Sequence, residues 1–295
     1  EDNDKENKKM ADLIDGKAFA AKIRAEVKED SDKLISQKQV DPCLAVVLVG
    51  ENPASKVYVG QKTKMAAECN IKTKDFKLEA STDQETLLKL IDELNNDSSV
   101  HGILVQLPLP KQIDERKVID AIVVEKDVDG FHAINAGRLS IGGDMLKKAF
   151  IPCTPLGSLL LLKDHVEDLK GKSAVVIGRS NIVGKPMSQL LIEESCTVTV
   201  VHSKTKEIEK VCSQADIIVA AIGRAEMIDS KWLKDGAVVI DVGINRISIT
   251  KEDGSEGSKI VGDVDFDSAS EKASKITPVP GCLLYTSDAA DEFSC

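Results

Sequence analysis

The chain has 295 residues, a length that favours two domains over one. Hydrophobic residues make up 42% and charged residues 30%, which excludes general disorder. The formal charge of −10 argues against a nucleic-acid partner, and no apolar run approaches the ~18 residues of a membrane span. Aromatic residues are only 3% of the chain, so the cores must be aliphatic, which favours buried parallel strands.

Seven scattered cysteines, with no C-x-x-C pair, indicate reduced thiols and no structural zinc site. The histidines show no metal spacing either, so we expect no metal. The first nine residues are polar and lack the apolar segment of a signal peptide. A cytoplasmic location is therefore expected.

In the first half of the chain, aliphatic strands alternate with helical segments, which is typical of α/β folds. Residues 127–143 are punctuated by glycines and are expected to be rich in loop structure. The pattern predicts helices over 18–34, 53–69, 83–94 and 114–122, and strands over 44–49, 73–78 and 102–107.

The alternation restarts after Pro152, so we expect a first domain over residues 10–150 and a second over 151–281. Residues 251–258 are polar and are expected to form a hairpin or loop. The second half predicts helices over 155–165 and 184–194, and strands over 173–178, 197–202, 216–222, 237–242 and 259–261.

A glycine turn follows the predicted strand 173–178. Glycines at 178 and 184 permit a tight turn, and the helix start beyond them offers unpaired N–H groups to a phosphate. The spacing is G-x5-G, whereas dinucleotide-binding turns usually read G-x-G-x-x-G. The turn therefore indicates either a dinucleotide site or an ordinary strand-to-helix connection.

The end of the next predicted strand bears on the choice of cofactor. NAD-binding units place an acidic residue there to bind the ribose 2′-hydroxyl, but this chain has His202, Ser203 and Lys204. Together with Arg179 across the turn, these groups suit a 2′-phosphate, so we infer NADP. A solvated polar strand end is the alternative.

Lys62 is the only charged member of an otherwise apolar or aromatic stripe on the predicted helix 53–69, whose other members are Tyr58, Met65, Ala66 and Cys69. Desolvation on such a stripe lowers the pKa of a lysine, which would let it exchange protons near neutral pH. Extension of the side chain into solvent is the alternative.

Two further polar features stand in apolar surroundings. Gln106 lies at the carboxyl end of an aliphatic strand, the edge that faces the ligand crevice in open α/β sheets. It could hydrogen-bond a lysine or cap a loop. Asp127 and Asp129 lie in a turn beside a glycine, where turn chemistry explains them without any function.

Nine motifs, in order along residues 12–281, resemble those of one family, the bifunctional methylenetetrahydrofolate dehydrogenase/cyclohydrolases. So many ordered motifs make the resemblance highly specific. They are IDGK (14–17), GENPASKVYVGQK (50–62), VQLPLP (105–110), EKDVDGFHAINAGRL (125–139), PCTPLG (152–157), VVIGRSNIVGKPM (175–187), IDVGINR (240–246), VGDVDF (261–266) and ITPVPG (276–281).

The resemblance implies two α/β domains across a cleft, the C-terminal one Rossmann-like with a mostly parallel sheet, usually in a homodimer. It implies oxidation of 5,10-methylenetetrahydrofolate to the 5,10-methenyl form, with NADP in most members of the family. Hydrolysis of the methenyl form to 10-formyltetrahydrofolate is the second implied activity.

The resemblance also implies roles for individual residues. Lys62 would be the general acid/base of the hydrolysis, tuned by Gln106, and Asp129 would bind the pterin ring. On the substrate side, Tyr58 would stack on the p-aminobenzoyl group, Val105 and Leu107 would lie at the substrate, and Pro280 and Gly281 would form a folate-side loop. On the cofactor side, Ile244 would lie near the nicotinamide. The residues that would hold NADP are Gly178, Arg179, Ser180 and Ser203.

The resemblance ends at Gly281, where the family continues with further glycines, a Pro-Met-Thr sequence and a long helix. Residues 282–295 look instead like translated adapter sequence, so we expect them to be an artefact. Two alternatives therefore stay open. The chain could be an NADP-binding but catalytically inactive truncated homologue, or a Schiff-base lyase that uses Lys62, since a desolvated lysine also suits imine chemistry.

Overall fold

The structure is a computed structural model that describes residues 10–250 and 254–281. The chain divides into two compact units between Leu156 and Gly157, and the segment before Ala18 joins the second half. We call residues 18–156 the first unit, and residues 10–17 with 157–281 the second unit. The expected artefact at 282–295, and residues 251–253 of the expected hairpin or loop, lie outside the described residues.

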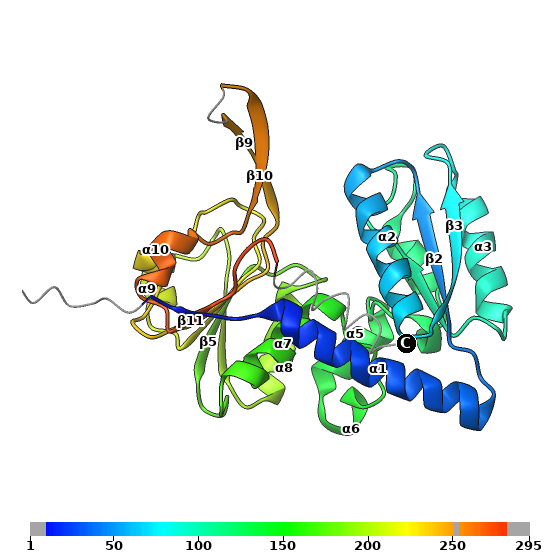
Figure 1. Ribbon diagram of the computed structural model, residues 1–295, viewed down its shortest axis with the longest axis horizontal. Helices are drawn as coiled ribbons and strands as arrows, with labels where there is room; N and C mark the ends of the chain where they lie inside the picture. The colour runs from blue at the N-terminus through cyan, green and yellow to red at the C-terminus, as the bar shows by residue number, and fades with distance from the viewer. Residues whose placement is uncertain (1–9, 251–253, 282–295) are drawn as a thin grey trace, which may run out of the picture. The chain divides into compact units, whose positions relative to one another are not determined.

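The first unit contains a parallel sheet in the order β3-β2-β4. The central strand β2 (Cys43–Val49) is buried at every residue, between β3 (Lys72–Leu78) and β4 (Gly102–Val105). Because the connections to β3 and β4 run in opposite directions along the sheet, right-handed crossovers place α2 (Pro53–Glu68) and α3 (Gln84–Asn96) on opposite faces (Figure 1).

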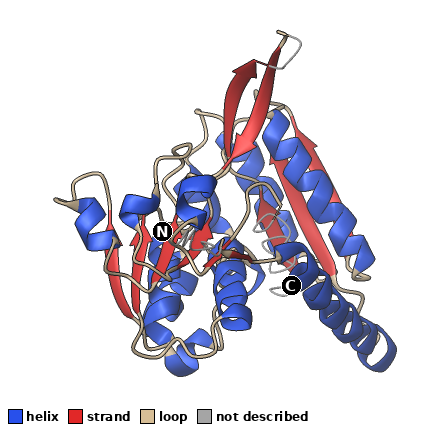
Figure 2. Ribbon diagram, turned by 60° about the vertical axis from the view of Figure 1, so that its left-hand side comes forward, coloured by secondary structure: helices blue, strands red, loops and turns tan. Residues whose placement is uncertain are grey.

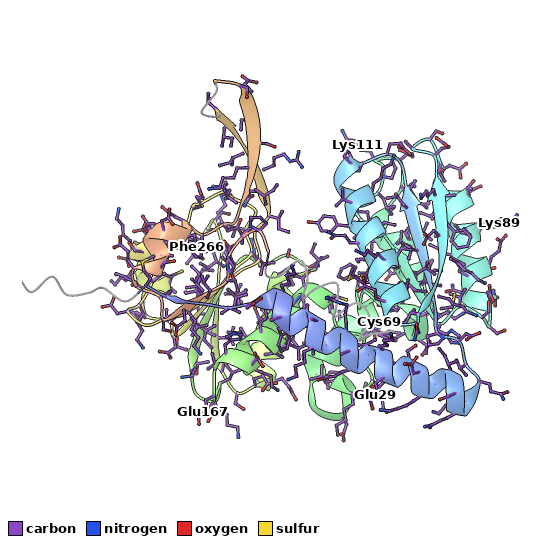
Figure 3. The ribbon with its side chains drawn as sticks, in the orientation of Figure 1. Glu29, Cys69, Lys89, Lys111, Glu167 and Phe266 are labelled. Atoms are coloured by element: carbon purple, nitrogen blue, oxygen red, sulfur yellow. The ribbon has the colours of Figure 1, made fainter. Side chains whose placement is uncertain are left out.

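Helix α3 shows how the sequence positions these layers. The Asp83 carboxylate accepts a hydrogen bond from the Thr86 amide, which caps the first turn. Leu87, Ile91 and Leu94 are buried, whereas Lys89 points away from the sheet (Figure 3). The helix predicted over residues 83–94 is confirmed, and it extends from Gln84 to Asn96.

The expectation of loop-rich structure at residues 127–143 is wrong, because α5 (Ala133–Ile141) lies within this stretch. His132 Nδ1 accepts from the Ile134 amide and caps this helix, and Asn135 and Leu139 are buried on one face. The remaining helices of this part of the chain are α1 (Gly16–Lys38), α4 (Glu115–Ala121), the 3-10 helix η1 (Val124–Lys126) and α6 (Gly143–Leu146).

The second unit contains a six-stranded sheet in the order β1-β11-β8-β7-β5-β6, with every pair parallel. From β5 the chain first adds a strand on one side and then on the other, which creates a topological switch point. The strands are β1 (Asp12–Leu13), β5 (Ser173–Ile177), β6 (Thr197–Val201), β7 (Ile217–Ala220), β8 (Val238–Asp241) and β11 (Lys275–Ile276).

A separate antiparallel hairpin, β9 (Asn245–Thr250) with β10 (Glu256–Val261), projects from the second unit (Figure 2). None of the helices in the described ranges combines the length and apolarity that a membrane crossing requires. The helices of this part of the chain are α7 (Cys153–His165), α8 (Gly184–Glu193), α9 (Ile208–Cys212), η2 (Ser230–Trp232) and α10 (Phe266–Ser270).

Candidate active site

A pocket of about 470 Å3 lies at the switch point of the second unit, within the ~300–1,000 Å3 typical of ligand sites. It brings together Gly178, Arg179, Ser180 and Ser203, four of the five residues expected at the cofactor. Ile244, the fifth, is 48% exposed in the connection after β8 and is not among the lining residues. The other lining residues are Ile177, His202, Thr205, Ile208, Ala221, Ile222, Arg224, Met227 and Trp232.

The glycine turn after β5 requires its glycines. Gly178 has φ +122°, and a Cβ there would overlap the Ala221 carbonyl oxygen. A Cβ on Gly184 would in turn overlap the Gly178 carbonyl. The turn therefore has room for backbone but for no side chain, which lets a ligand approach the peptide groups closely.

Ser180 uses its hydroxyl within the turn. Its Oγ accepts from the Val183 and Gly184 amides, at 3.1 and 3.3 Å. Two of the amides that the sequence offered to a phosphate are therefore already bound by the chain itself. The Arg179 side chain is exposed at the same turn, where it can reach an anionic ligand.

The carboxyl end of β6 forms a compact polar turn. The His202 amide donates to Thr205 Oγ1 at 2.9 Å, and the Lys204 amide donates to His202 Nδ1 at 3.2 Å. None of the residues that line the pocket is acidic, whereas Arg179 and Arg224 both line it. This charge pattern fits a dinucleotide that carries a 2′-phosphate.

Sequence reasoning missed Arg224 as a pocket residue. It lies two residues beyond the predicted strand 216–222, at the edge where ligands bind in open α/β sheets. Its position at this edge of the sheet was the signal by which the sequence could have identified it.

In the first unit, Gln106 directly follows β4, and its amide donates to the Val47 carbonyl at 2.9 Å. Its side-chain Nε2 donates to the Leu107 carbonyl at 2.8 Å, whereas Oε1 is buried with no hydrogen-bond partner among the described residues. A buried acceptor left in this state costs about 1–3 kcal/mol. It therefore marks a position where a donor from a ligand or a lysine would be bound.

The neighbouring residues of the VQLPLP motif differ in exposure. Val105 is 4% exposed and belongs to the core of the unit, and half-buried Leu107 packs against that core. A contact between Val105 and a ligand would therefore involve its backbone.

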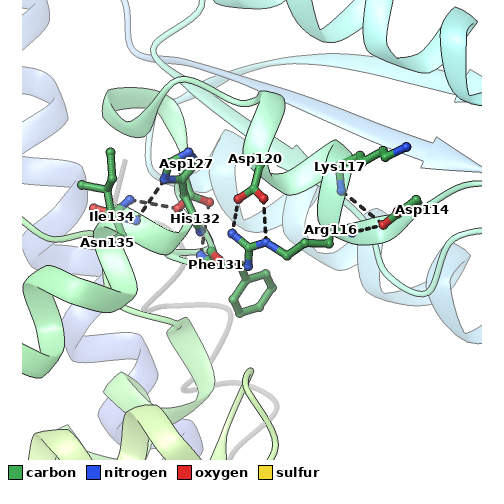
Figure 4. Close-up of polar contacts among 9 residues, drawn as sticks. All are labelled: Asp114, Arg116, Lys117, Asp120, Asp127, Phe131, His132, Ile134 and Asn135. Carbon is green, nitrogen blue, oxygen red and sulfur yellow. Dashed lines mark hydrogen bonds and ion pairs between the residues drawn. The ribbon is translucent and has the colours of Figure 1, made fainter.

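The two carboxylates after η1, Asp127 and Asp129, differ in burial, and Figure 4 shows the contacts of Asp127. Asp127 is 1% exposed and accepts from the His132 amide at 2.8 Å and from Asn135 Nδ2 at 2.9 Å. A parallel bridge joins Asp127 to Ile103 of β4, and the chain then turns, with the Gly130 amide donating to the Asp127 carbonyl at 3.1 Å. Asp127 holds this turn, which contains half-buried Asp129.

Helix α2 begins as predicted, because Asn52 Oδ1 accepts from the Ser55 amide at 3.2 Å. Tyr58 and Lys62 are both half-buried, and Ala66 and Cys69 further along the stripe are buried. A Cβ on Gly60 would meet nothing within 4 Å. Packing therefore does not require this glycine.

Pro280 and Gly281 follow β11 at the end of the described residues, where Pro280 is exposed and Gly281 half-buried. They belong to the second unit, whereas Tyr58, Lys62 and Gln106 belong to the first. No group of three or more His, Cys, Asp or Glu within the described residues is arranged to hold a metal ion.

The parallel sheet, its switch-point pocket and the glycine turn define a Rossmann-type dinucleotide-binding enzyme. Comparison with known families identifies the enzyme more closely. The catalytic-domain model of the tetrahydrofolate dehydrogenase/cyclohydrolase family matches residues 14–129. The NAD(P)-binding-domain model of the same family matches residues 152–284.

Individual relatives agree with these matches. The bifunctional protein FolD of Erythrobacter litoralis is 56% identical over 92% of this chain and 89% of its own length. The crystal structure of the bifunctional FolD methylenetetrahydrofolate dehydrogenase/cyclohydrolase from Campylobacter jejuni is 48% identical, with a TM-score of 0.89 over 96% of both chains. A Trypanosoma brucei FolD structure, complexed with NADP and an inhibitor, is 35% identical, with a TM-score of 0.88 over 97% of this chain and 96% of that one.

The chain belongs to the tetrahydrofolate dehydrogenase/cyclohydrolase family. It is an enzyme with dehydrogenase and cyclohydrolase activities on folate substrates, and its cofactor is NADP. The predicted family, α/β fold class with a mostly parallel sheet, enzyme class and cofactor are confirmed.

Proposed function

We propose that the first unit carries out the chemistry on folate through Lys62, Gln106 and Asp129. The reactions are the NADP-linked oxidation of 5,10-methylenetetrahydrofolate to the methenyl form and the hydrolysis of that form to 10-formyltetrahydrofolate. The buried Oε1 of Gln106, which has no hydrogen-bond partner among the described residues, carries this proposal. It is an acceptor that Lys62 or a folate group would satisfy, directly after the strand that is bridged to the Asp127 turn.

The hydrolysis needs a group that moves protons. Water adds to the cationic methenyl carbon and loses one proton, which gives a neutral adduct. As the bond from that carbon to the ring nitrogen N5 breaks, the hydroxyl loses its remaining proton to form the formyl group and N5 takes one up, so one proton is released overall. Lys62 is half-buried on helix α2, and it would serve as the group that takes up and returns these protons. Gln106 Oε1 would accept a hydrogen bond from the lysine and hold it in position. The Asp129 carboxylate would accept from the N–H groups of the pterin, and Tyr58 would stack on the p-aminobenzoyl group.

On the cofactor side, Arg179 and Ser203 would bind the 2′-phosphate, and the backbone at Gly178 and Ser180 would approach the dinucleotide. When bound, NADP supplies the hydride acceptor for the oxidation. Ile244 would pack near the nicotinamide, and Pro280 and Gly281 would border the folate.

Lys62→Met tests the assignment, with Lys64→Met as the matched control, since Lys64 is exposed on another face of the same helix. We expect Lys62→Met to lose methenyl hydrolysis, measured as decay of the methenyl absorbance, and to keep NADP affinity. The Lys64 variant should hydrolyse at the wild-type rate.

Wild-type hydrolysis by the Lys62 variant would overturn the role of the lysine. Borohydride trapping of a carbonyl substrate on Lys62 would favour the Schiff-base lyase alternative. A chain that binds NADP but catalyses neither reaction would favour the inactive-homologue alternative.

A homodimer and a cytoplasmic location complete the proposal. The hairpin of β9 and β10 is a two-stranded ribbon, which is marginally stable by itself, and it carries Ile249 at 36% exposure. Pairing with a second copy would cover these features. Five cysteines of the described residues are buried and in no disulfide, which suits a reducing compartment; they are Cys43, Cys69, Cys153, Cys196 and Cys212.

A further inference from the structure

One wall of the cofactor pocket is an irregular connection after β7. Ala221, Ile222, Arg224 and Met227 line the pocket from this segment, which has no helix or strand hydrogen bonding of its own from residue 221 to 227. The position of this wall must therefore be set by contacts with other parts of the unit.

Backbone hydrogen bonds hold the two ends of this segment, from the Ala221 amide to the Ile177 carbonyl and from the Glu226 amide to the Gly262 carbonyl. Asp263, between β10 and α10, holds residues 222–224 between them. It is 0% exposed, and its Oδ2 accepts from the amides of Ile222 and Gly223, at 2.7 and 3.0 Å. Its Oδ1 accepts from the Arg224 amide and from Asn245 Nδ2, both at 2.9 Å. One carboxylate thus joins three consecutive amides of the pocket wall to the first residue of β9.

The amide N–H groups of residues 222–224 point toward the buried carboxylate of Asp263. Consecutive backbone N–H groups in a loop form a concave site for an anion, and here the anion is a side chain of the same chain. The peptide groups of the wall are held from behind, while Ile222 and Arg224 face the pocket.

The space around the carboxylate is shaped for it. A Cβ on Gly243 would overlap Asp263 Oδ1, and a Cβ on Gly262 would overlap Asp241 Oδ2. Asp241 is a second buried carboxylate, 3% exposed, that accepts from the amides of Gly243, Asp263 and Val264. Each glycine therefore makes room for the carboxylate of the other segment.

We propose that Asp263 is a positioning residue for the cofactor, because it fixes the wall that presents Ile222 and Arg224 to NADP. The proposal rests on the cofactor site described under the proposed function. Asp263 does not line the pocket, so it acts through the residues whose amides it binds.

Asp263→Asn is the direct test. Each carboxylate oxygen accepts from two donors, so either orientation of the new amide places an NH2 group against two N–H groups. Loss of such hydrogen bonds to a charged group should raise the KM for NADP about ten- to hundredfold. We expect kcat of the dehydrogenase to change much less, and the rate of methenyl hydrolysis, which uses no NADP, to stay unchanged.

Asp241→Asn is the matched control. It also removes a buried carboxylate that binds three backbone amides, but none of those amides belongs to a residue that lines the pocket. If the role of Asp263 is only structural, both substitutions should lower the melting temperature, and the KM for NADP should be alike in the two variants. The proposal requires the KM to rise in the Asp263 variant well beyond its change in the Asp241 variant.

Asn245→Ala provides a milder test if Asp263→Asn does not fold. It removes one of the four donors, and we expect a smaller rise in the KM for NADP, with hydrolysis unchanged. An unchanged KM in the foldable variant, or a parallel fall of both activities, would overturn the positioning role. If the wild-type enzyme itself does not use NADP, the proposed function fails instead, which separates the two cases.

Discussion

At the proposed cofactor site of the second unit, we expect single side chains to distinguish NADP from NAD. Arg179 and Ser203 lie on two different connections, and no acidic residue lines the space between them. A 2′-phosphate would therefore meet positive charge and hydrogen-bond donors, whereas a ribose hydroxyl would find no carboxylate acceptor among the lining residues.

Arg179→Ala should reduce the preference for NADP over NAD. Loss of a charged hydrogen bond costs about 1.5–3 kcal/mol, which corresponds to roughly ten- to 150-fold in affinity. The ratio of kcat/KM for the two cofactors measures the effect. Arg246→Ala is the control, because Arg246 is exposed on β9 and does not line the pocket. Equal use of both cofactors by the wild-type enzyme would contradict the argument.

Asp241 should make the stability of the protein depend on pH. Burial raises the pKa of its carboxyl to about 6, against the effect of its three amide donors. Since the ordinary value is near 4, the folded state binds more protons than the unfolded state between about pH 4 and 6. The contribution of Asp241 to the free energy of unfolding is therefore greatest below pH 4 and falls as pH rises to 6.

Asp241→Asn removes this titration. The difference in unfolding free energy, variant minus wild type, should rise by up to about 3 kcal/mol between pH 4 and 6.5. Urea unfolding at several pH values measures it. Asp235→Asn, at a side chain that is 89% exposed, should give a profile parallel to that of the wild type. A flat difference for Asp241→Asn would show that its carboxylate is not perturbed by burial.

At the scale of elements, α5 illustrates how a buried polar side chain connects a helix to the segments around it. Asn135, 0% exposed, donates to Asp127 Oδ2 at 2.9 Å and to the Val124 carbonyl at 3.3 Å. Its Oδ1 accepts from the Phe150 amide at 3.2 Å. The helix is thereby connected to the turn before it and to the segment after α6.

Asn135→Ala should destabilise the enzyme by about 1–3 kcal/mol, because it leaves Asp127 and the Phe150 amide short of partners in a buried environment. The same variant should raise the KM for folate, since Asp127 holds the turn that leads to Asp129. Urea unfolding and folate kinetics measure the two effects. The control, Asn96→Ala at the exposed end of α3, should stay within about 0.5 kcal/mol of the wild type. Equal stability of the Asn135 and Asn96 variants would show that Asn135 does not have this role.

At the scale of the whole molecule, the exposed hairpin is the feature that predicts a homodimer. Ile249→Lys places a charge on β9, where burial against a second copy would make it costly. Light scattering should give twice the chain mass for the wild type and a shift toward the single-chain mass for the variant. Ile192→Lys, at an exposed site on α8, should leave the mass unchanged. A monomeric wild type, or a dimer unaffected by Ile249→Lys, would contradict the hairpin as the interface.

Much of this protein could be predicted from local sequence. Aliphatic runs of four to seven residues between amphipathic helices determine an α/β fold, because both faces of a parallel strand must be covered. Helix starts at Asn52 and Asp83 were readable from capping chemistry. The glycine turn and the residues after β6 indicated the cofactor, because each of these signals is a short run of residues that can be recognised by itself.

Only the tertiary structure decided which polar groups are buried and what they bind. Asp263 contacts a wall about 40 residues earlier in the chain, and Arg224 reaches the cofactor pocket from a third connection. The buried acceptor of Gln106 is likewise defined by its surroundings in space. Periodicity and turn chemistry report on neighbours along the chain, whereas hydrogen bonding in a parallel sheet joins segments that are far apart in sequence.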